Sequence, residues 1–416
     1  MKKFVALLIA LCVVFGLCIG YRAVPINDAA GFDESQPIAV EPTPVEPLEP
    51  AATPDAATAP DAAADTAPAL STDFAAIYAL HDPYEVVALV DGLDLSWADY
   101  YYFLYFQAQQ MNNYFAQMSA YYGMNVGWQD EYDAGESFEQ HAVTAAEGIV
   151  RELYGIENYA SAHNCVLSDE DKETLASKHE SDMLTICGEG ASEEDFNAAL
   201  EAMYMPRAVL DRLNTCELLY INAFEQQYGA QGELVDEAQA IKFLEDNGYL
   251  AANHILFLTT DSETGEALSD EEIAEKKAKA EEIAAELQAI TDPEERLARF
   301  AELKAELDED TGKTGYPEGY VFTEGTMVPE FEDGVKALED YEVSEPILSS
   351  YGYHVIIRLP HDAGRTVTYT SAGEPVDARY LCASGAYTNE VQSVIDDVEI
   401  EYVPGFEPIV LSDYVK

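Results

Sequence analysis

The sequence has few basic side chains. Its 416 residues include 21 lysines and arginines against 79 aspartates and glutamates, and the formal net charge at pH 7 is −58. A surface of this charge repels phosphate backbones, and no basic stripe or basic helix offsets it. We therefore expect no nucleic acid among the partners of the chain.

Cysteine is also scarce. Two of the six cysteines lie in an apolar run near the N-terminus, which leaves Cys165, Cys187, Cys216 and Cys382. Four cysteines are too few to form a disulfide scaffold in a chain of this length. The lack of a Cys-x-x-Cys pair argues against a zinc ribbon or a thioredoxin-like redox motif. The sequence leaves two alternatives for these four residues: one disulfide, or buried free thiols.

Signatures of catalysis and of metal binding are missing as well. Residues 74–247 contain no nucleophile elbow, no phosphate-binding loop and no paired-histidine metal motif. The acidic stretches 261–272 and 308–319 lack the glycine that a calcium loop has at its sixth position, and the second also lacks the closing glutamate. We expect neither a metal nor another cofactor.

The first 26 residues have the pattern of an export signal. Lys2 and Lys3 form a charged start, and an apolar run follows over residues 4–20. The run is slightly shorter than the roughly 20 residues of a relaxed membrane span, and no small-x-small cleavage site stands out. We interpret residues 1–26 as an export signal or membrane anchor.

Residues 27–73 are dominated by Ala, Pro, Asp, Glu and Thr. Such a segment cannot bury enough apolar surface to offset the entropy lost on ordering it, and its prolines favour an extended chain. We interpret it as a disordered linker that separates the membrane segment from the folded part.

Residues 74–247 are predicted to form a mainly helical lobe. A short strand over 85–92 precedes a helix capped by Ser96, and further helices are predicted over 138–163, 168–184, 208–228 and 236–247. The first turns of the helix after Ser96 are apolar nearly all round, from Trp97 to Phe106. This pattern indicates either a helix buried on all sides or an aromatic face presented to partners.

Residues 248–361 have a different pattern. Two β-rich runs each carry a histidine, His254 in the first and His354 in the second. Two capped helices, a short aromatic strand and a third helix are predicted between them. This order predicts an α+β unit with a small sheet.

The residues of this unit resemble the parvulin family of peptidyl-prolyl cis/trans isomerases. The matching segments are 253–256, 300–303, 308–310, 322–331, 343–346 and 351–356. The likeness covers about a quarter of the chain. It implies an α+β fold: a parvulin-like domain, in which helices surround a small antiparallel sheet, joined to a mainly α-helical, chaperone-like lobe.

The layout of the chain is similar to that of exported bacterial foldases and chaperones. In these proteins a helix of the C-terminal segment, here within 362–416, packs back on the N-terminal lobe. Val391, Val394, Ile395 and Val398 supply the apolar stripe that this helix needs. The likeness implies a position on the outer side of the bacterial cytoplasmic membrane, anchored through the N-terminal segment.

The implied reaction is rotation about Xaa-Pro bonds in unfolded or partly folded exported polypeptides. The barrier of ~18–20 kcal/mol comes from the partial double bond of the amide. Lowering it needs no nucleophile and no cofactor, only a pocket that favours the twisted amide. The resemblance implies that Phe322, Met327 and Phe331 form this substrate-binding pocket.

The resemblance also implies a catalytic set beneath the pocket. His254 and His354 are expected side by side on neighbouring strands. Ser349 matches the position of a hydroxyl partner, and Asp310 the position of an acidic partner. We interpret the two histidines as bracing the floor of the pocket.

The sequence departs from the family at several positions. Residues 315–320 replace the usual Gly-Gly-x-Leu-Gly segment, and Asp308 stands where many relatives have serine. Asp261, Glu263 and Glu266 occupy the loop in which phosphate-selective parvulins carry basic residues, so phospho-specificity is expected to be absent. The alternatives are a non-catalytic holdase chaperone with a vestigial parvulin domain and a tethered protein of purely structural role.

Overall fold

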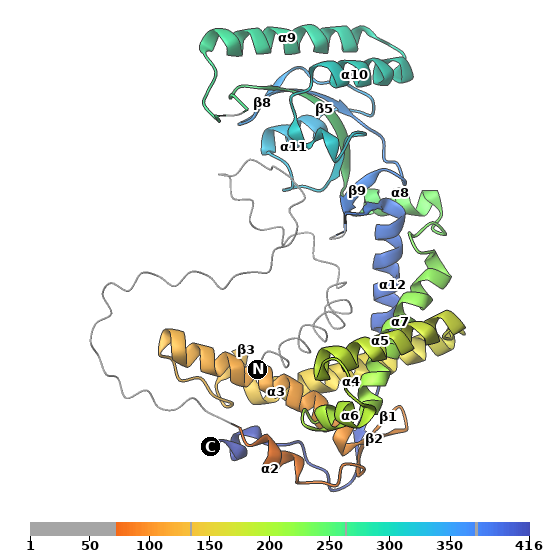
Figure 1. Cartoon of the computed structure of the whole chain (residues 1–416). Helices are drawn as coiled ribbons and strands as arrows, with labels where there is room; N and C mark the ends of the chain where they lie inside the picture. Colours follow the sequence, from red (N-terminus) through yellow and green to blue (C-terminus); the bar gives the residue numbers. More distant parts are fainter. Residues whose placement is uncertain (1–71, 134, 263, 371–372) are drawn as a thin grey trace, which may run out of the picture. The chain divides into compact units, whose positions relative to one another are not determined.

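The computed structural model describes residues 72–133, 135–262, 264–370 and 373–416, which form two compact units (Figure 1). The first unit contains the described residues up to Gln226 together with Tyr387–Lys416, and the second contains Gln227–Ala386. No helix among these residues is long and apolar enough to cross a membrane. The expected export segment 1–26 and most of the expected linker lie outside the described residues.

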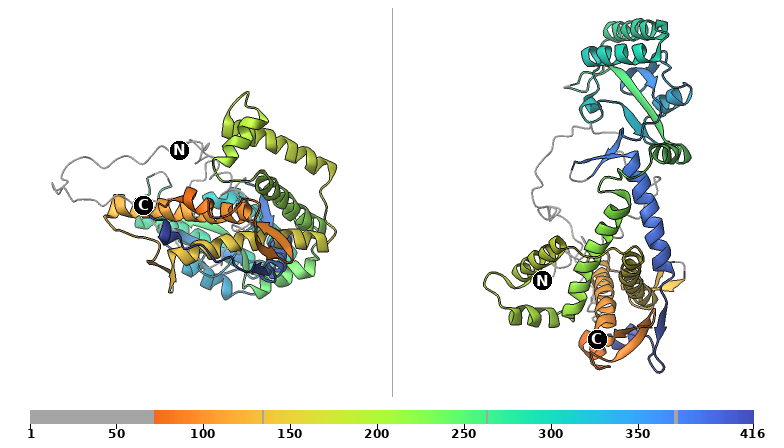
Figure 2. Two further views of the ribbon diagram at one scale, coloured as in Figure 1. Left: turned by 90° about the horizontal axis from the view of Figure 1, so that it is seen from below. Right: turned by 90° about the vertical axis from the view of Figure 1, so that its right-hand side faces the viewer.

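The first unit is mainly helical, as expected. Its elements are α2 (Phe74–Tyr78), β1 (Val86–Val90), β2 (Leu93–Ser96), α3 (Trp97–Tyr122), β3 (Glu131–Asp133), β4 (Glu136–Ser137), α4 (Phe138–Ala162), α5 (Asp169–Cys187), α6 (Glu193–Glu201), most of α7 (Arg207–Tyr228), the second half of α12 (Ala378–Asp396), β11 (Ile400–Tyr402) and the 3-10 turn η2 (Leu411–Tyr414). The long helices α3 and α4 lie side by side (Figures 1 and 2).

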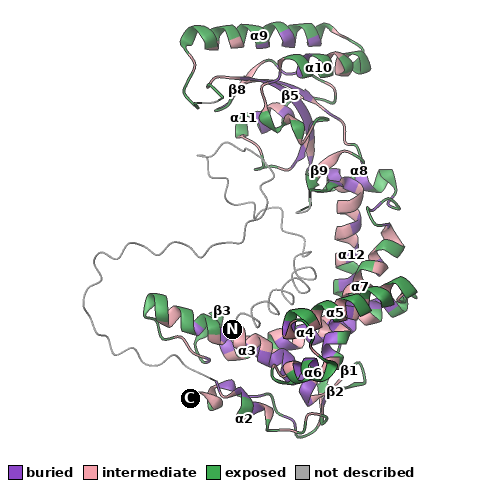
Figure 3. Cartoon of the chain, viewed as in Figure 1, coloured by how far each residue is buried: buried purple, intermediate pink, exposed green. Residues whose placement is uncertain are grey.

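The aromatic start of α3 forms the core of this unit. The Ser96 hydroxyl accepts a hydrogen bond from Asp99 N and caps the helix. The first turns of α3 are buried (Figure 3). Trp97 is fully buried and donates from its indole N–H to the Tyr78 carbonyl, while the Tyr101 hydroxyl donates to the Phe74 carbonyl. The first turns of α3 are therefore buried on all sides and do not present an aromatic face to partners.

Of the C-terminal segment 362–416, Tyr387–Lys416 folds into the first unit. Strand β11 pairs with β1, with Tyr402 opposite Ala88, and closes a sheet of order β11-β1-β2. Val391 and Val398 are buried, and Ile395 of α12 lies against Gly155 of α4. The contact is so close that a Cβ added at Gly155 would lie 2.8 Å from Ile395 Cα.

The second unit has the expected α+β fold, and the expected order of elements is confirmed. Its elements are the end of α7, α8 (Glu237–Asp246), β5 (Leu250–Leu258), α9 (Asp270–Ala289), α10 (Pro293–Leu307), η1 (Thr311–Thr314), β6 (Tyr320–Phe322), α11 (Pro329–Lys336), β7 (Ile347–Leu348), β8 (Gly352–Arg358), β9 (Thr366–Tyr369), β10 (Pro375–Asp377) and the first half of α12. It extends beyond 248–361 on both sides because α8 and the β9–β10 hairpin fold with it.

The sheet of the second unit has the order β6-β5-β8-β7, and all its pairs are antiparallel. Helices α9 and α10 cover one face and α11 covers the other (Figures 1 and 2). Successive side chains of a strand point to opposite faces. On β5, His254 therefore faces Phe331 of α11, and Asn253 faces Lys304 of α10.

The close contact at Gly155 leads to a stability prediction. We expect Gly155→Ala to lower the free energy of unfolding by about 1–3 kcal/mol, because the new methyl group must displace Ile395 from α4. Gly148→Ala on the same helix is the matched control: its Cβ would meet nothing within 4 Å. We expect the control to stabilise the protein by about 0.5–1 kcal/mol through helix propensity alone. Urea unfolding measures both, and an equal response of the two variants would contradict this packing.

Candidate functional site

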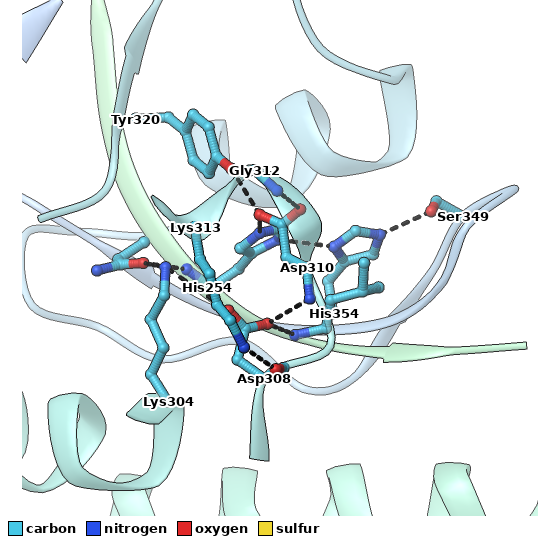
Figure 4. A network of polar contacts seen from close by, with 11 residues as sticks. His254, Lys304, Asp308, Asp310, Gly312, Lys313, Tyr320, Ser349 and His354 are labelled. Atoms are coloured by element: carbon cyan, nitrogen blue, oxygen red, sulfur yellow. Dashed lines mark hydrogen bonds and ion pairs between the residues drawn. The ribbon is translucent and has the colours of Figure 1, made fainter. Parts of the chain in front are cut away.

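The two predicted strand histidines meet on one face of the sheet. In the pairing of β5 with β8, Leu256 lies opposite His354 and His254 lies opposite Ile356, so the histidines are diagonal neighbours. His254 Nδ1 and His354 Nδ1 are 2.9 Å apart, and the imidazole rings stack with their centroids 5.1 Å apart (Figure 4). Both side chains are buried.

A continuous chain of hydrogen bonds extends from this pair in both directions (Figure 4). At one end, His354 Nε2 lies 2.7 Å from the Ser349 hydroxyl. At the other end, His254 Nε2 lies 3.0 Å from Asp310 Oδ2. The same carboxylate oxygen accepts a 2.5 Å hydrogen bond from the Tyr320 hydroxyl. The structure thus brings together the four residues expected in the catalytic set and adds Tyr320.

Asp310 is the negative end of this chain. Burial alone raises the pKa of its carboxyl group, but hydrogen bonds from His254, Tyr320 and the Gly312 N–H outweigh burial and hold the pKa well below its usual range. His354 has the opposite character. Burial and, to a smaller extent, the neighbouring His254 lower its pKa to about 3, so His354 is neutral near pH 7.

The carboxylate of Asp310 sets the direction of the hydrogen bond next to it. A carboxylate only accepts, so His254 Nε2 carries the proton that faces Asp310. If that is the only proton on His254, its Nδ1 accepts from His354 Nδ1–H, and His354 Nε2 then accepts from the Ser349 hydroxyl. Ser349 Oγ also accepts from Tyr351 N at 3.1 Å and is buried. Its hydroxyl is thus engaged inside the fold and not presented as a nucleophile.

Asp308 anchors the turn that carries Asp310. Its Oδ1 accepts hydrogen bonds from Leu256 N on β5 and from Asp310 N. Its Oδ2 is buried with no hydrogen-bond partner in the described part of the chain, and Lys304 Nζ lies 3.9 Å from it. Lys304 donates to Asn253 Oδ1 at 2.6 Å, and burial lowers the pKa of this lysine.

The three expected pocket residues converge above the histidines. The Phe331 ring meets His254 edge-on at 5.3 Å between centroids and His354 at 5.6 Å. Phe322 lies 5.8 Å from Phe331, and both rings are buried. Met327 is half-buried and packs against the same cluster. Two buried aromatic rings and a half-buried methionine thus stand over a polar floor.

Glu332 fixes the position of Met327 and was not identified from the sequence. It is buried, and its Oε1 accepts hydrogen bonds from Gly325 N at 2.8 Å and Met327 N at 2.9 Å. The loop before α11 is therefore tied to the first turn of that helix. The only signal in the sequence was an acidic residue beside the predicted pocket residue Phe331.

The described residues contain no cluster of histidine, cysteine, aspartate and glutamate that could hold a metal ion. The four cysteines left open by the sequence are free thiols in this structure. In the loop after β5, Asp261 and Glu266 are exposed, and Glu263 lies outside the described residues.

A family model supports the resemblance seen in the sequence. Residues 254–359 match the rotamase family, described as the PPIC-type PPIase domain. The chain is 31% identical over 168 residues to a foldase protein PrsA of Oceanobacillus iheyensis, covering 40% of this chain and 46% of that protein. It is 32% identical over 120 residues to a chaperone SurA of Nitrosospira multiformis, covering 27% of each. The chain thus spans less than half the length of these relatives.

Among solved structures, PrsA from Bacillus subtilis aligns with 76% of this chain and 93% of its own. The sequence identity is 17% and the TM-score is 0.22.

The buried histidine predicts that stability depends on pH. An imidazole in the unfolded chain titrates near pH ~6.5, whereas the pKa of folded His354 is about 3. Between these values the unfolded state binds a proton that the folded state does not, so the free energy of unfolding rises with pH through this window. The contribution of neutral His354 to the free energy of unfolding is complete above pH ~6.5. It is lost as the pH falls toward ~3.

Urea unfolding of the full chain and of His354→Asn across this window tests the expectation. The variant lacks the titrating group, so its free energy of unfolding should depend less steeply on pH than that of the wild type. Parallel curves for the two proteins would show that His354 does not carry the dependence.

Proposed function

We propose that this chain is a parvulin-type peptidyl-prolyl cis/trans isomerase, because residues 254–359 match the model of the PPIC-type PPIase domain. Its proposed substrates are Xaa-Pro bonds in unfolded or partly folded exported polypeptides. The observation that carries the proposal is the position of Phe331, whose ring contacts both imidazoles of the hydrogen-bonded chain and also Phe322.

The proposed site acts by favouring a twisted amide over a planar one. Phe322, Met327 and Phe331 hold the proline ring in an apolar environment. Twisting breaks amide resonance, so the carbonyl becomes less polar and the nitrogen becomes a better hydrogen-bond acceptor. A pocket of low polarity over His354, which burial keeps neutral, suits this change, because no charge on this imidazole favours the polar planar amide.

The proposed substrates are not phosphorylated. Asp261 and Glu266 are exposed in the loop that follows β5. Carboxylates at this position repel a phosphate group before proline.

The proposed location is the outer side of the bacterial cytoplasmic membrane. Residues 1–26 would direct export and anchor the chain, and the linker that follows would hold the folded units away from the membrane surface. The charged start and apolar run of the N-terminal segment support this part of the proposal.

An isomerisation assay on Xaa-Pro peptides, run without a coupling protease, tests the activity. We expect Met327→Ala to lower kcat/KM by about tenfold, because it removes an apolar wall of the pocket. Met327→Leu, which keeps most of the apolar volume, is the matched control and should retain most of the activity. His254→Ala should cost less than Met327→Ala.

Two results would count against this proposal. A wild-type rate equal to the uncatalysed background would rule out the isomerase. A larger loss in His254→Ala than in Met327→Ala would contradict the view that the apolar pocket matters more than the imidazoles.

A second candidate function is a holdase chaperone. It is favoured by exposed apolar side chains at the end of α3 in the first unit, where Tyr121 is 81% and Tyr122 is 72% exposed and Met124 follows. In this case unfolded chains would bind these side chains irrespective of the proline pocket.

Suppression of client aggregation by the full chain tests the second candidate. We expect the double substitution Tyr121→Ser, Tyr122→Ser to weaken suppression by removing exposed aromatic surface, while Met327→Ala leaves it intact. Tyr84→Ser is the matched control, since Tyr84 is an 88% exposed tyrosine elsewhere in the same unit. Equal suppression by the double variant and the control would remove this candidate.

A further inference from the structure

Tyr320 is the member of the hydrogen-bonded chain to which the sequence assigned no role. Its hydroxyl donates to Asp310 Oδ2 at 2.5 Å, and its ring meets the His254 ring at right angles, with centroids 5.6 Å apart. The ring also packs against the apolar cluster that contains Phe322 and Phe331. One side chain therefore touches both the polar floor and the apolar wall of the proposed site.

The backbone determines where this side chain lies. Strand β6 pairs with β5, with Tyr320 opposite Ala252 and Phe322 opposite Leu250, so Tyr320 and Phe322 point to the same face. The turn before β6 contains Gly319 at φ +100°, where a Cβ would lie 2.6 Å from the Ala252 carbonyl oxygen. Glycine therefore lets the strand begin close enough to β5 for Tyr320 to reach Asp310.

We propose that Tyr320 is a positioning residue of the isomerase site, whose hydroxyl holds the Asp310 carboxylate in line with His254 Nε2 and thereby sets the tautomers of both histidines. The proposal rests on the isomerase function proposed above. It gives Tyr320 a role through Asp310, without contact to the amide that rotates.

The direction of the hydrogen bonds explains why this hydroxyl matters. A carboxylate at Asp310 requires a proton on His254 Nε2. If His254 carries no second proton, each later bond runs from Ser349 toward Asp310. If Asp310 gained a proton and donated it to His254 Nε2, every bond in the chain would reverse. His354 Nε2–H would then donate to Ser349. The Tyr320 hydroxyl donates to Asp310 and so stabilises its carboxylate form. It therefore favours the arrangement in which His254 Nε2 carries the proton.

Other charged and titratable groups around Asp310 also affect whether it is a carboxylate or a carboxylic acid. The titratable and charged side chains near Asp310 are His254 on β5, His354 on β8, Tyr320 on β6, Lys304 on α10, Asp308 at the end of α10 and Lys313 on η1. The two lysines favour the carboxylate and Asp308 opposes it. Since Tyr320→Phe removes a hydroxyl without changing any of these charges, it isolates the effect of the hydrogen bond.

The test compares Tyr320→Phe with Tyr316→Phe in the full chain. Tyr316 is a matched control because its ring lies 5.0 Å from that of Tyr320, and its hydroxyl has no hydrogen bond in the described part of the chain. We expect Tyr320→Phe to lower kcat/KM by about three- to tenfold and to move the acidic limb of its pH profile to higher pH. Tyr316→Phe should leave both unchanged.

A double-mutant cycle tests whether the effect passes through Asp310. In an Asp310→Ala background, Tyr320→Phe should cause no further loss, because the hydroxyl has no carboxylate left to hold. A full additional loss in that background would show that Tyr320 acts on the substrate or on packing, and would overturn the positioning role.

A measurement independent of turnover separates this inference from the proposed function. Imidazole nitrogen and Asp310 carboxyl NMR shifts, followed against pH, report the tautomers and the titration of Asp310 directly. We expect the Asp310 titration to move to higher pH in Tyr320→Phe and not in Tyr316→Phe, even if the wild type proves inactive as an isomerase. Identical titrations and tautomers in the two variants would overturn the inference, including the case in which Tyr320→Phe alone loses activity.

Discussion

The register between β5 and β8 is the constraint on which the rest of the site depends. It places His354 opposite Leu256, two residues from His254, so both imidazoles lie on the face covered by α11. A slip of one residue would turn one histidine to the opposite face. The apolar positions of both strands oppose such a slip, because Ile255, Val355 and Ile357 would be exchanged with polar side chains at sites that helices cover.

The two faces of β5 are coupled through the turn at its edge. On the face of α10, Asn253 binds the buried ammonium group of Lys304, which lies near the buried carboxylate of Asp308. Burying these charges is costly unless hydrogen bonds compensate. Asp308 gains two backbone donors, and one of them is the N–H of Asp310 on the other side of the turn. The hydrogen bonds of Asp308 on the α10 face therefore also position the Asp310 carboxylate, which contacts His254 on the α11 face.

Much of the site could be predicted from the sequence, because it depends on residues that recur in a fixed order. The resemblance to the parvulin family implied the set of Ser349, His354, His254 and Asp310, and the residues that carry it include the two strand histidines and the segment from Met327 to Phe331. Tyr320 and Glu332 were beyond prediction for a physical reason. A tyrosine in a short strand and a glutamate in the first turn of a helix have ordinary local explanations, and only the tertiary fold brings them to Asp310 and to the N–H of Met327.

The hydrogen-bonded chain has the components of a proton relay, yet rotation about an amide bond transfers no proton. Its value to the proposed reaction therefore lies in its charge distribution. Asp310 is the only carboxylate in this hydrogen-bonded series, and His254 separates it from His354. The pKa of about 3 keeps His354 neutral beneath Phe331. A cationic imidazole at this position would favour the more polar planar amide over the twisted one. Keeping His354 neutral thus removes an interaction that would stabilise the ground state more than the transition state.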